Sequence, residues 1–120
     1  MRASLISIVV SATMTLAASQ ALAHAQLEKA TPAVGGTISA PSQIRLEFSE
    51  GVEPKFTKVV LTGPDGKSIP LSASTVEGAE GSVLVTPIGK SLAPGAYKVH
   101  WRAVSVDSHH TQGDFGFTVK

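Results

Sequence analysis

The stretch YKVHWRAVSVDSHHTQGDFGFTV, residues 97–119, holds the most regular alternation of apolar and polar side chains in the chain. Odd positions from 97 to 101 and from 115 to 119 are apolar and mostly aromatic, whereas the even positions between them are polar, basic or glycine. Side chains of a β-strand point to opposite faces in turn, so the pattern predicts strands over 97–106 and 115–119. The polar segment DSHHTQG, residues 107–113, joins these strands at one end of the fold.

Shorter runs of the same kind precede this stretch. They cover residues 44–48, 59–61 and 83–85, and Pro and Gly residues separate them at frequent intervals. No segment keeps the period of an amphipathic helix. Six or seven short strands in one small domain predict an all-β fold, a small Greek-key β-barrel or sandwich of about seven strands.

Tyr97 follows a Pro94-Gly95 turn at the start of the longest predicted strand. This arrangement resembles the tyrosine corner of immunoglobulin-like sandwiches, in which the hydroxyl bonds to the backbone a few residues upstream. An ordinary turn followed by a half-buried tyrosine is the alternative.

Residues 1–23 resemble a secretory signal peptide. Arg2 precedes a short apolar stretch, and Ala21-Leu22-Ala23 matches the small-x-small cleavage pattern. Removal after Ala23 leaves residues 24–120 as one domain, whereas removal after Ala25, a second small-x-small site, would discard His24. A retained membrane anchor is a further alternative, although the apolar stretch is short for a spanning helix.

Composition restricts the partners and the metals of the domain. Of the ten Lys and Arg residues, only Arg2 lies in residues 1–23, so residues 24–120 contain nine Lys and Arg and nine Asp and Glu. This balance argues against nucleic acid or an anionic membrane surface as the partner. The chain has no cysteine, and Met1 and Met14 are its two methionines. Residues 24–120 therefore offer a metal only nitrogen and oxygen donors.

Asp107 and His109 form an Asp-x-His pair, whose side chains point to the same side of an extended chain. Cleavage after Ala23 would make His24 the first residue, whose free α-amine and ring Nδ1 can bind one ion together. With Asp107 and His109, His24 would supply three nitrogens and one oxygen, a set that favours Cu(II) in a square-planar or tetragonal arrangement. A solvated hairpin tip without metal is the alternative.

Residues 97–119 resemble the C-terminal signature of the CopC family of periplasmic copper-binding proteins, approximately Y-x-V-x-W-R-x-V-S-x-D-x-H-x-x-x-G-x-x-x-F-x-V. HAQLEKATPAVGG (24–36) and IRLEFSEGVEP (44–54) resemble that family's opening and next strand. The resemblance implies an immunoglobulin-like or cupredoxin-like sandwich in the periplasm. It also implies one Cu(II) ion bound by His24, Asp107 and His109, with Glu50 either beside the ligands or on the surface.

The same resemblance implies a role in copper homeostasis, resistance or transport without enzymatic turnover, and an inner-membrane copper transporter of the CopD type as partner. Some family members carry a Cu(I) site in a Met-rich middle segment, but residues 61–82 here contain neither Met nor His. The resemblance therefore implies the form with a single Cu(II) site. We expect His100 and His110 to be exposed and Trp101 to lie in the core.

Three other functions stay open at this point. A copper-dependent oxidase of the N-terminal-histidine class would share the terminal chelate, but one Trp and one Tyr are few aromatics for its broad substrate surface. A zinc site could use two histidines, one aspartate and a water. A metal-free structural sandwich domain needs no ligands at all.

Overall fold

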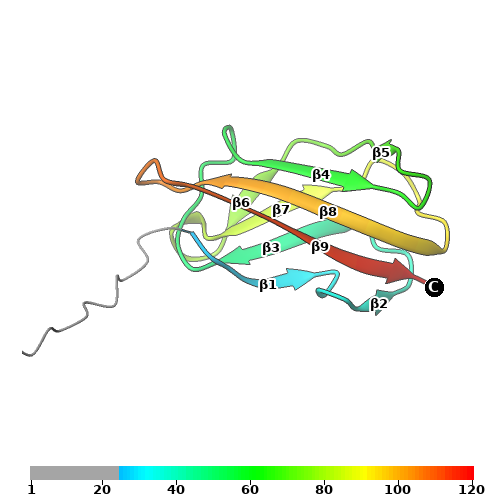
Figure 1. Cartoon of the computed structure of the whole chain (residues 1–120). Coiled ribbons are helices and arrows are strands. Elements are labelled where there is room, and N and C mark those ends of the chain that lie inside the picture. The colour runs from blue at the N-terminus through cyan, green and yellow to red at the C-terminus, as the bar shows by residue number, and fades with distance from the viewer. Residues whose placement is uncertain (1–24) are drawn as a thin grey trace, which may run out of the picture.

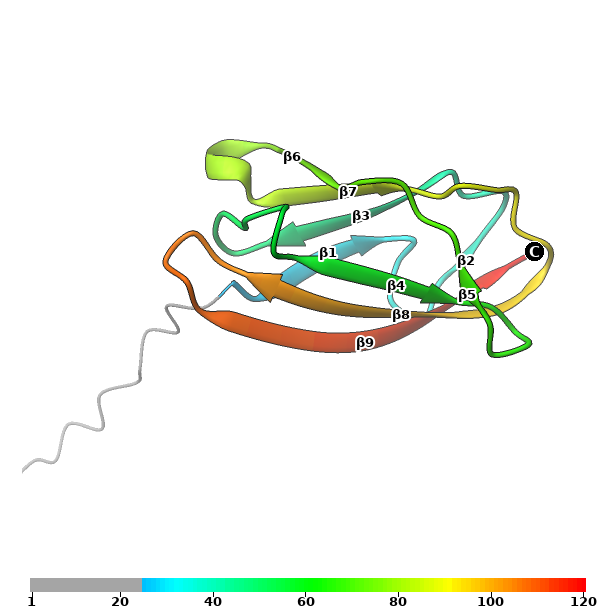
Figure 2. The same ribbon diagram turned by 90° about the horizontal axis from the view of Figure 1, so that it is seen from above.

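The computed structural model describes residues 25–120, which form a sandwich of two β-sheets (Figures 1 and 2). One sheet has the strand order β1-β3-β7-β6 and the other the order β2-β9-β8-β4-β5. The elements are β1 (Leu27–Thr31), β2 (Thr37–Ile38), β3 (Gln43–Phe48), β4 (Lys58–Thr62), β5 (Ser68–Ile69), β6 (Thr75–Glu77), a 3-10 turn η1 (Ala79–Gly81), β7 (Val83–Pro87), β8 (Gly95–Val104) and β9 (His110–Val119). The predicted all-β sandwich is confirmed, with nine strands in place of about seven.

The predicted signal peptide, residues 1–23, and His24 lie outside the described residues. Within residues 25–120, no helix is long and apolar enough to cross a membrane.

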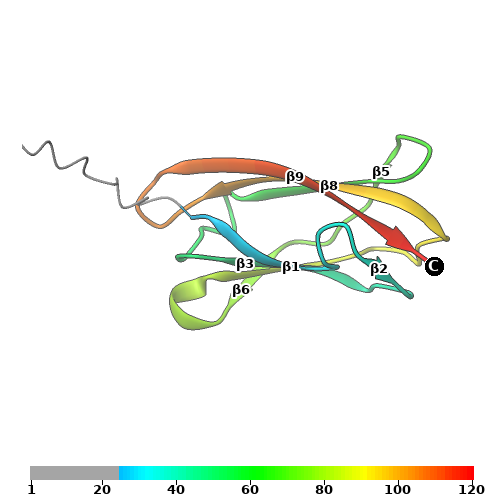
Figure 3. The same ribbon diagram turned by 60° about the horizontal axis from the view of Figure 1, so that its bottom comes forward.

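The core lies between the two sheets, whose separation is clear in Figure 3. Its fully buried side chains come from the inner strands of both sheets, among them Ile44, Leu46, Leu61, Leu84 and Val99. Trp101 is also buried, as predicted, and packs edge-on against Phe48 with the ring centroids 5.3 Å apart. Burial of these apolar side chains is the main force that holds the sheets together.

β8 and β9 form the central hairpin, in which ten residues pair with ten, from Gly95 opposite Val119 to Val104 opposite His110. The prediction of a last strand beginning at residue 115 was wrong, since β9 already begins at His110. Gly113 explains why the alternation is hidden there. It faces inward without a side chain, and a Cβ at this position would lie 2.7 Å from Cζ2 of Trp101. The indole fills the place that an apolar side chain of β9 would take.

The tyrosine corner is confirmed. Tyr97 is buried, and its hydroxyl donates a hydrogen bond of 2.6 Å to the carbonyl oxygen of Ala93, four residues upstream. The Tyr97 ring stacks on Phe117 with the centroids 5.5 Å apart. The bond fixes the turn that leads into β8 at the end of the sandwich opposite the β8–β9 turn (Figure 1).

Candidate metal centre

The turn between β8 and β9 is closed by backbone hydrogen bonds. Ser105 N–H donates to the His109 oxygen over 2.9 Å, and Ser108 N–H donates to the Ser105 oxygen over 2.9 Å. Ser108 takes a positive φ of 72°, which reverses the chain between Asp107 and His109. The assumption of an extended chain at these two residues was therefore wrong: a turn, and not strand alternation, sets their positions.

Asp107 and His109 nevertheless come together. The Asp107 Oδ2 atom lies 2.9 Å from the His109 Nδ1 atom, and both side chains are substantially exposed. The other oxygen, Oδ1, accepts hydrogen bonds from the Ser105 hydroxyl and, over 3.3 Å, from the His109 N–H. The Asp107 carboxylate thus contacts the His109 imidazole through one oxygen, and the Ser105 hydroxyl and the His109 N–H hold its other oxygen.

The electrostatics of the turn keep Asp107 ionised. The hydrogen bond from Ser105, followed by the hydrogen bond from His109, lowers the pKa of Asp107 from 3.8 to about 2. Ser105 is itself almost completely buried and has no freedom to leave. The turn therefore presents a carboxylate that is ready to bind a cation at any pH above that range.

Ala25, the first described residue, lies against the same hairpin. Its carbonyl oxygen accepts a hydrogen bond of 2.9 Å from the hydroxyl of Thr111, two residues beyond His109, and Ala25 is only 1% exposed. All three views place the start of the described chain at the end of the sandwich that carries the β8–β9 turn (Figures 1, 2 and 3). The described chain therefore begins beside the β8–β9 hairpin.

Glu50 lies at this end as well. Its neighbour Gly51 accepts a hydrogen bond of 3.1 Å from the Val106 N–H, and Val52 pairs with Ser105 in an isolated bridge. The Glu50 Oε1 atom is buried and has no hydrogen-bond partner among residues 25–120. Because a buried polar oxygen without a partner costs about 1–3 kcal/mol, this atom is suited to receive a donor from a further group at this end.

Within residues 25–120, no group of three or more His, Asp or Glu side chains is arranged to hold a metal ion. Asp107 and His109 are brought together, whereas Glu50 does not join them as a third ligand. His110 is exposed, as predicted, and His100 is half-exposed, with its Nδ1 atom 2.7 Å from Oδ1 of Asp114. Among the described residues, this turn therefore offers a metal one adjacent pair of side-chain donors, Asp107 and His109.

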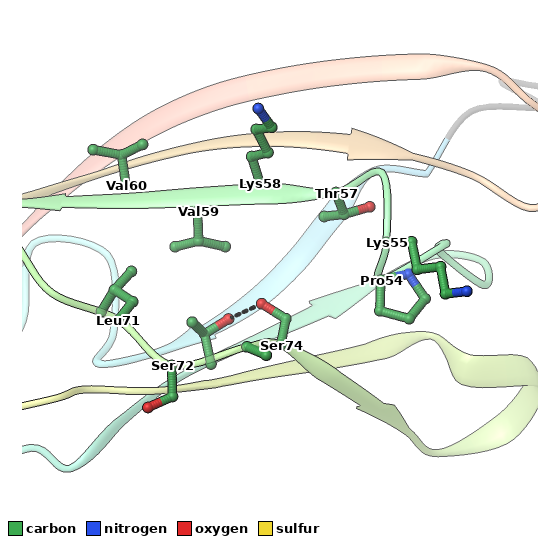
Figure 4. A pocket seen from close by; sticks show the side chains of 11 residues that line it. Pro54, Lys55, Thr57, Lys58, Val59, Val60, Leu71, Ser72 and Ser74 are labelled. Carbon is green, nitrogen blue, oxygen red and sulfur yellow. Dashed lines mark hydrogen bonds between the residues drawn. The ribbon is translucent and has the colours of Figure 1, made fainter.

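A hollow of about 640 Å³ lies away from this turn, between β4 and residues 71–74 (Figure 4). Val59 points into it, and the hydroxyls of Ser74 and Thr86 bond to each other across its wall over 2.7 Å. It contains neither histidine nor carboxylate among its lining residues. This hollow is therefore not a candidate metal site.

Thr111 and Ser105 were not predicted as parts of the site. Thr111 holds the chain start, and Ser105 holds Asp107. Both are small hydroxyl residues in ordinary strand sequence, so their roles depend on contacts that no local pattern reveals.

Residues 27–120 match the family described as the CopC domain. Over 109 residues the chain is 38% identical to Protein YobA of Escherichia coli K12, covering 90% of this chain and 88% of that protein. It is 34% identical to Copper resistance protein C of Xanthomonas campestris pv. juglandis over 122 residues, covering 98% of this chain and 96% of the relative.

Two solved structures share the fold. The crystal structure of CopC from Methylosinus trichosporium OB3b has a TM-score of 0.74 and 28% identity, covering 81% of this chain and 94% of the other. That of PcoC, a methionine-rich copper resistance protein from Escherichia coli, has a TM-score of 0.68 and 35% identity, covering 82% of this chain and all of the other.

Proposed function

This chain belongs to the CopC family, and from that premise we propose that it binds one Cu(II) ion in the periplasm for copper homeostasis, resistance or transport. The proposed ligands are the α-amine and ring of His24, the carboxylate of Asp107 and the ring of His109. The removal of residues 1–23 by a signal peptidase is part of the proposal, because it creates the amine. The copper ion is cargo, and no catalytic turnover is required.

The Asp107–His109 pair carries this proposal. Two donor atoms that lie about 2 Å from one ion at a right angle are about 2.8 Å apart. The observed separation of 2.9 Å between Asp107 Oδ2 and His109 Nδ1 is that of a hydrogen bond, and it also allows an ion to replace the shared proton without moving the two side chains apart. The bond between Thr111 and Ala25 supports the third contributor, since it directs the chain start to the same turn.

The donor set favours oxidised copper. Residues 24–120 contain neither Cys nor Met, the soft ligands that Cu(I) prefers, whereas nitrogen donors with one carboxylate suit Cu(II). The α-amine of His24 would place N–H donors at the end of the sandwich where Glu50 lies. We propose that the buried Glu50 Oε1 atom accepts a hydrogen bond from that residue and orients it.

Copper titration of the exported protein tests the proposal. Its intact mass first establishes whether the mature chain begins at His24. We expect tetragonal Cu(II) EPR signals that persist against competing zinc, and a loss of affinity of several orders of magnitude in His24→Ala and His109→Ala. His110→Ala is the matched control, because His110 is the adjacent exposed histidine. Equal affinity in all four proteins would refute the assignment.

The chain start can be tested without removing a side chain. One residue added before His24 leaves the ring in place but moves the α-amine away. We expect affinity to fall by orders of magnitude, and an unchanged affinity would exclude the amine as ligand.

We propose an inner-membrane copper transporter of the CopD type as the partner that receives or supplies copper. Transport assays with and without such a transporter would test this.

A further inference from the structure

The outer face of β4, β8 and β9 carries positive charge that is not compensated. Burial alternates along β8, and its outward positions include Lys98, His100 and Arg102. Lys58 on β4 lies directly opposite Arg102, in the row that continues to Gln112 on β9. Like charges directly opposite each other on neighbouring strands destabilise a sheet, so this row has an unfavourable charge pairing.

No carboxylate among the described residues neutralises these cations. Asp114 is the single acidic residue of the three strands, and its Oδ1 atom lies 2.7 Å from Nδ1 of His100. No ion pair within residues 25–120 involves Lys58, Lys98 or Arg102. The face therefore presents three cations against one carboxylate that is already engaged.

The opposite face of the sandwich lacks this excess. Arg45 forms an ion pair with Glu77 across its strands, and Lys29 lies opposite Glu47 in the β1–β3 register. Arg45 and Lys29 on this sheet thus have acidic neighbours, whereas Lys58, Lys98 and Arg102 on the other sheet form no ion pair within residues 25–120. Overall neutrality of the domain conceals this difference.

Apolar surface lies within the basic face. Phe56, in the turn before β4, is 66% exposed, and Val60 on β4 is 41% exposed. A hollow of about 300 Å³ is lined by Phe56, Val104 and His110 together with the cations Lys58 and Arg102. An exposed aromatic ring beside an arginine is typical of protein interfaces.

We propose that the outer face of β4, β8 and β9 is the docking surface for an acidic protein partner. Carboxylates of the partner would face Lys58, Lys98 and Arg102, and an apolar side chain would enter the hollow beside Phe56. Three cations are few for an anionic membrane surface, which basic clusters of about four to eight residues recognise. A partner docked here would lie beside the β8–β9 turn, because His110 both lines the hollow and begins β9.

The metal-free protein tests this inference, so that its outcome is independent of the copper proposal. The probe is a fluorescent peptide of alternating glutamate and leucine, and its control is the same peptide with lysine in place of glutamate. We expect the acidic peptide to bind and to shift amide resonances of β4, β8 and β9. The affinity should fall steeply between about 0.01 M and 1 M salt, where the Debye length shortens from about 30 Å to about 3 Å.

Charge reversal locates the surface. We expect the double variant Lys58→Glu, Arg102→Glu to bind the acidic peptide at least about tenfold more weakly. The matched control is Lys67→Glu, Lys90→Glu, which changes the net charge equally at exposed lysines that line a separate hollow. Equal loss in both double variants, equal binding of the two peptides, or binding to phosphatidylglycerol vesicles alone would overturn the proposal. If a variant fails to fold, the resonance map of the wild-type protein decides.

Discussion

Replacing Thr111 with valine isolates the contact that holds the chain start against the hairpin. The change removes the hydroxyl that donates to the Ala25 oxygen over 2.9 Å but keeps the shape of the side chain. Ala25 is 1% exposed, so its carbonyl oxygen would remain buried without this partner, at a cost of about 1–2 kcal/mol. In the proposed site copper binds both the chain start and the hairpin, so the two must be docked. Part of the free energy of copper binding would then be spent on docking them. We expect Cu(II) affinity to fall about 5-fold to 30-fold.

The assay is competition for Cu(II) against a chelator of known affinity, with urea unfolding of the metal-free protein in parallel. Thr118→Val is the control, because Thr118 is an exposed residue of the same strand. The predicted loss is far smaller than that from removing a ligand, so Thr111→Val should fall between Thr118→Val and His109→Ala. Copper affinity equal to that of Thr118→Val would refute the idea that this bond prepares the site.

Two further predictions concern the hairpin itself. Gly113→Ala should destabilise the protein by about 1–3 kcal/mol in urea unfolding, since the new Cβ would lie 2.7 Å from Trp101. Gly116→Ala is the control and should cost less, because the nearest atom to a Cβ there is 3.4 Å away. Equal losses of stability in the two variants would contradict the predicted clash. The pKa of Asp107 is lowered to about 2 in the folded protein, so its stabilising contribution is present above the ordinary pKa and is lost as pH falls through about 2. Ser105→Ala should raise the titration midpoint of the Asp107 carboxyl carbon in NMR spectra toward its ordinary range, and an unmoved midpoint would exclude Ser105 as the cause.

The sequence predicted the strands of the sandwich interior and missed those at its edges. The runs at 44–48, 59–61 and 83–85 lie in strands with a neighbour on each side. The strand predicted for 97–106 does too as far as Val104, where β8 ends. The four strands without a predicted counterpart, β1, β2, β5 and β6, are the four edge strands. Edge strands are short and carry polar side chains, and β1 is further interrupted by a bulge between Leu27 and Lys29. Alternation of apolar and polar residues arises when one face of a strand is buried, and an edge strand buries too few side chains to show it.

The residues of the candidate site were also predicted only in part. Asp107 and His109 were predicted from their spacing, but the reason given, an extended chain, was wrong, because a turn with Ser108 at positive φ brings them together. Ser105 lies within four residues of both and still escaped prediction, since its importance comes from burial. Thr111 is separated from Ala25 by most of the chain, and only the folded sandwich brings them into contact.

The separation of the donors along the chain has a consequence for when copper can bind. Asp107 and His109 are placed by a turn whose backbone bonds and buried Ser105 belong to the folded domain. The proposed third contributor is the α-amine of His24, which exists only after residues 1–23 have been removed. Folding alone would then give a pair of ligands, too few to hold the ion tightly, and processing alone would give a terminal chelate without its partners. If the proposal holds, full affinity would require both events, and the precursor would not retain copper before its export. Comparing Cu(II) affinity of the folded precursor with that of the mature chain would test this directly, and equal affinities would show that the amine has no part in the site.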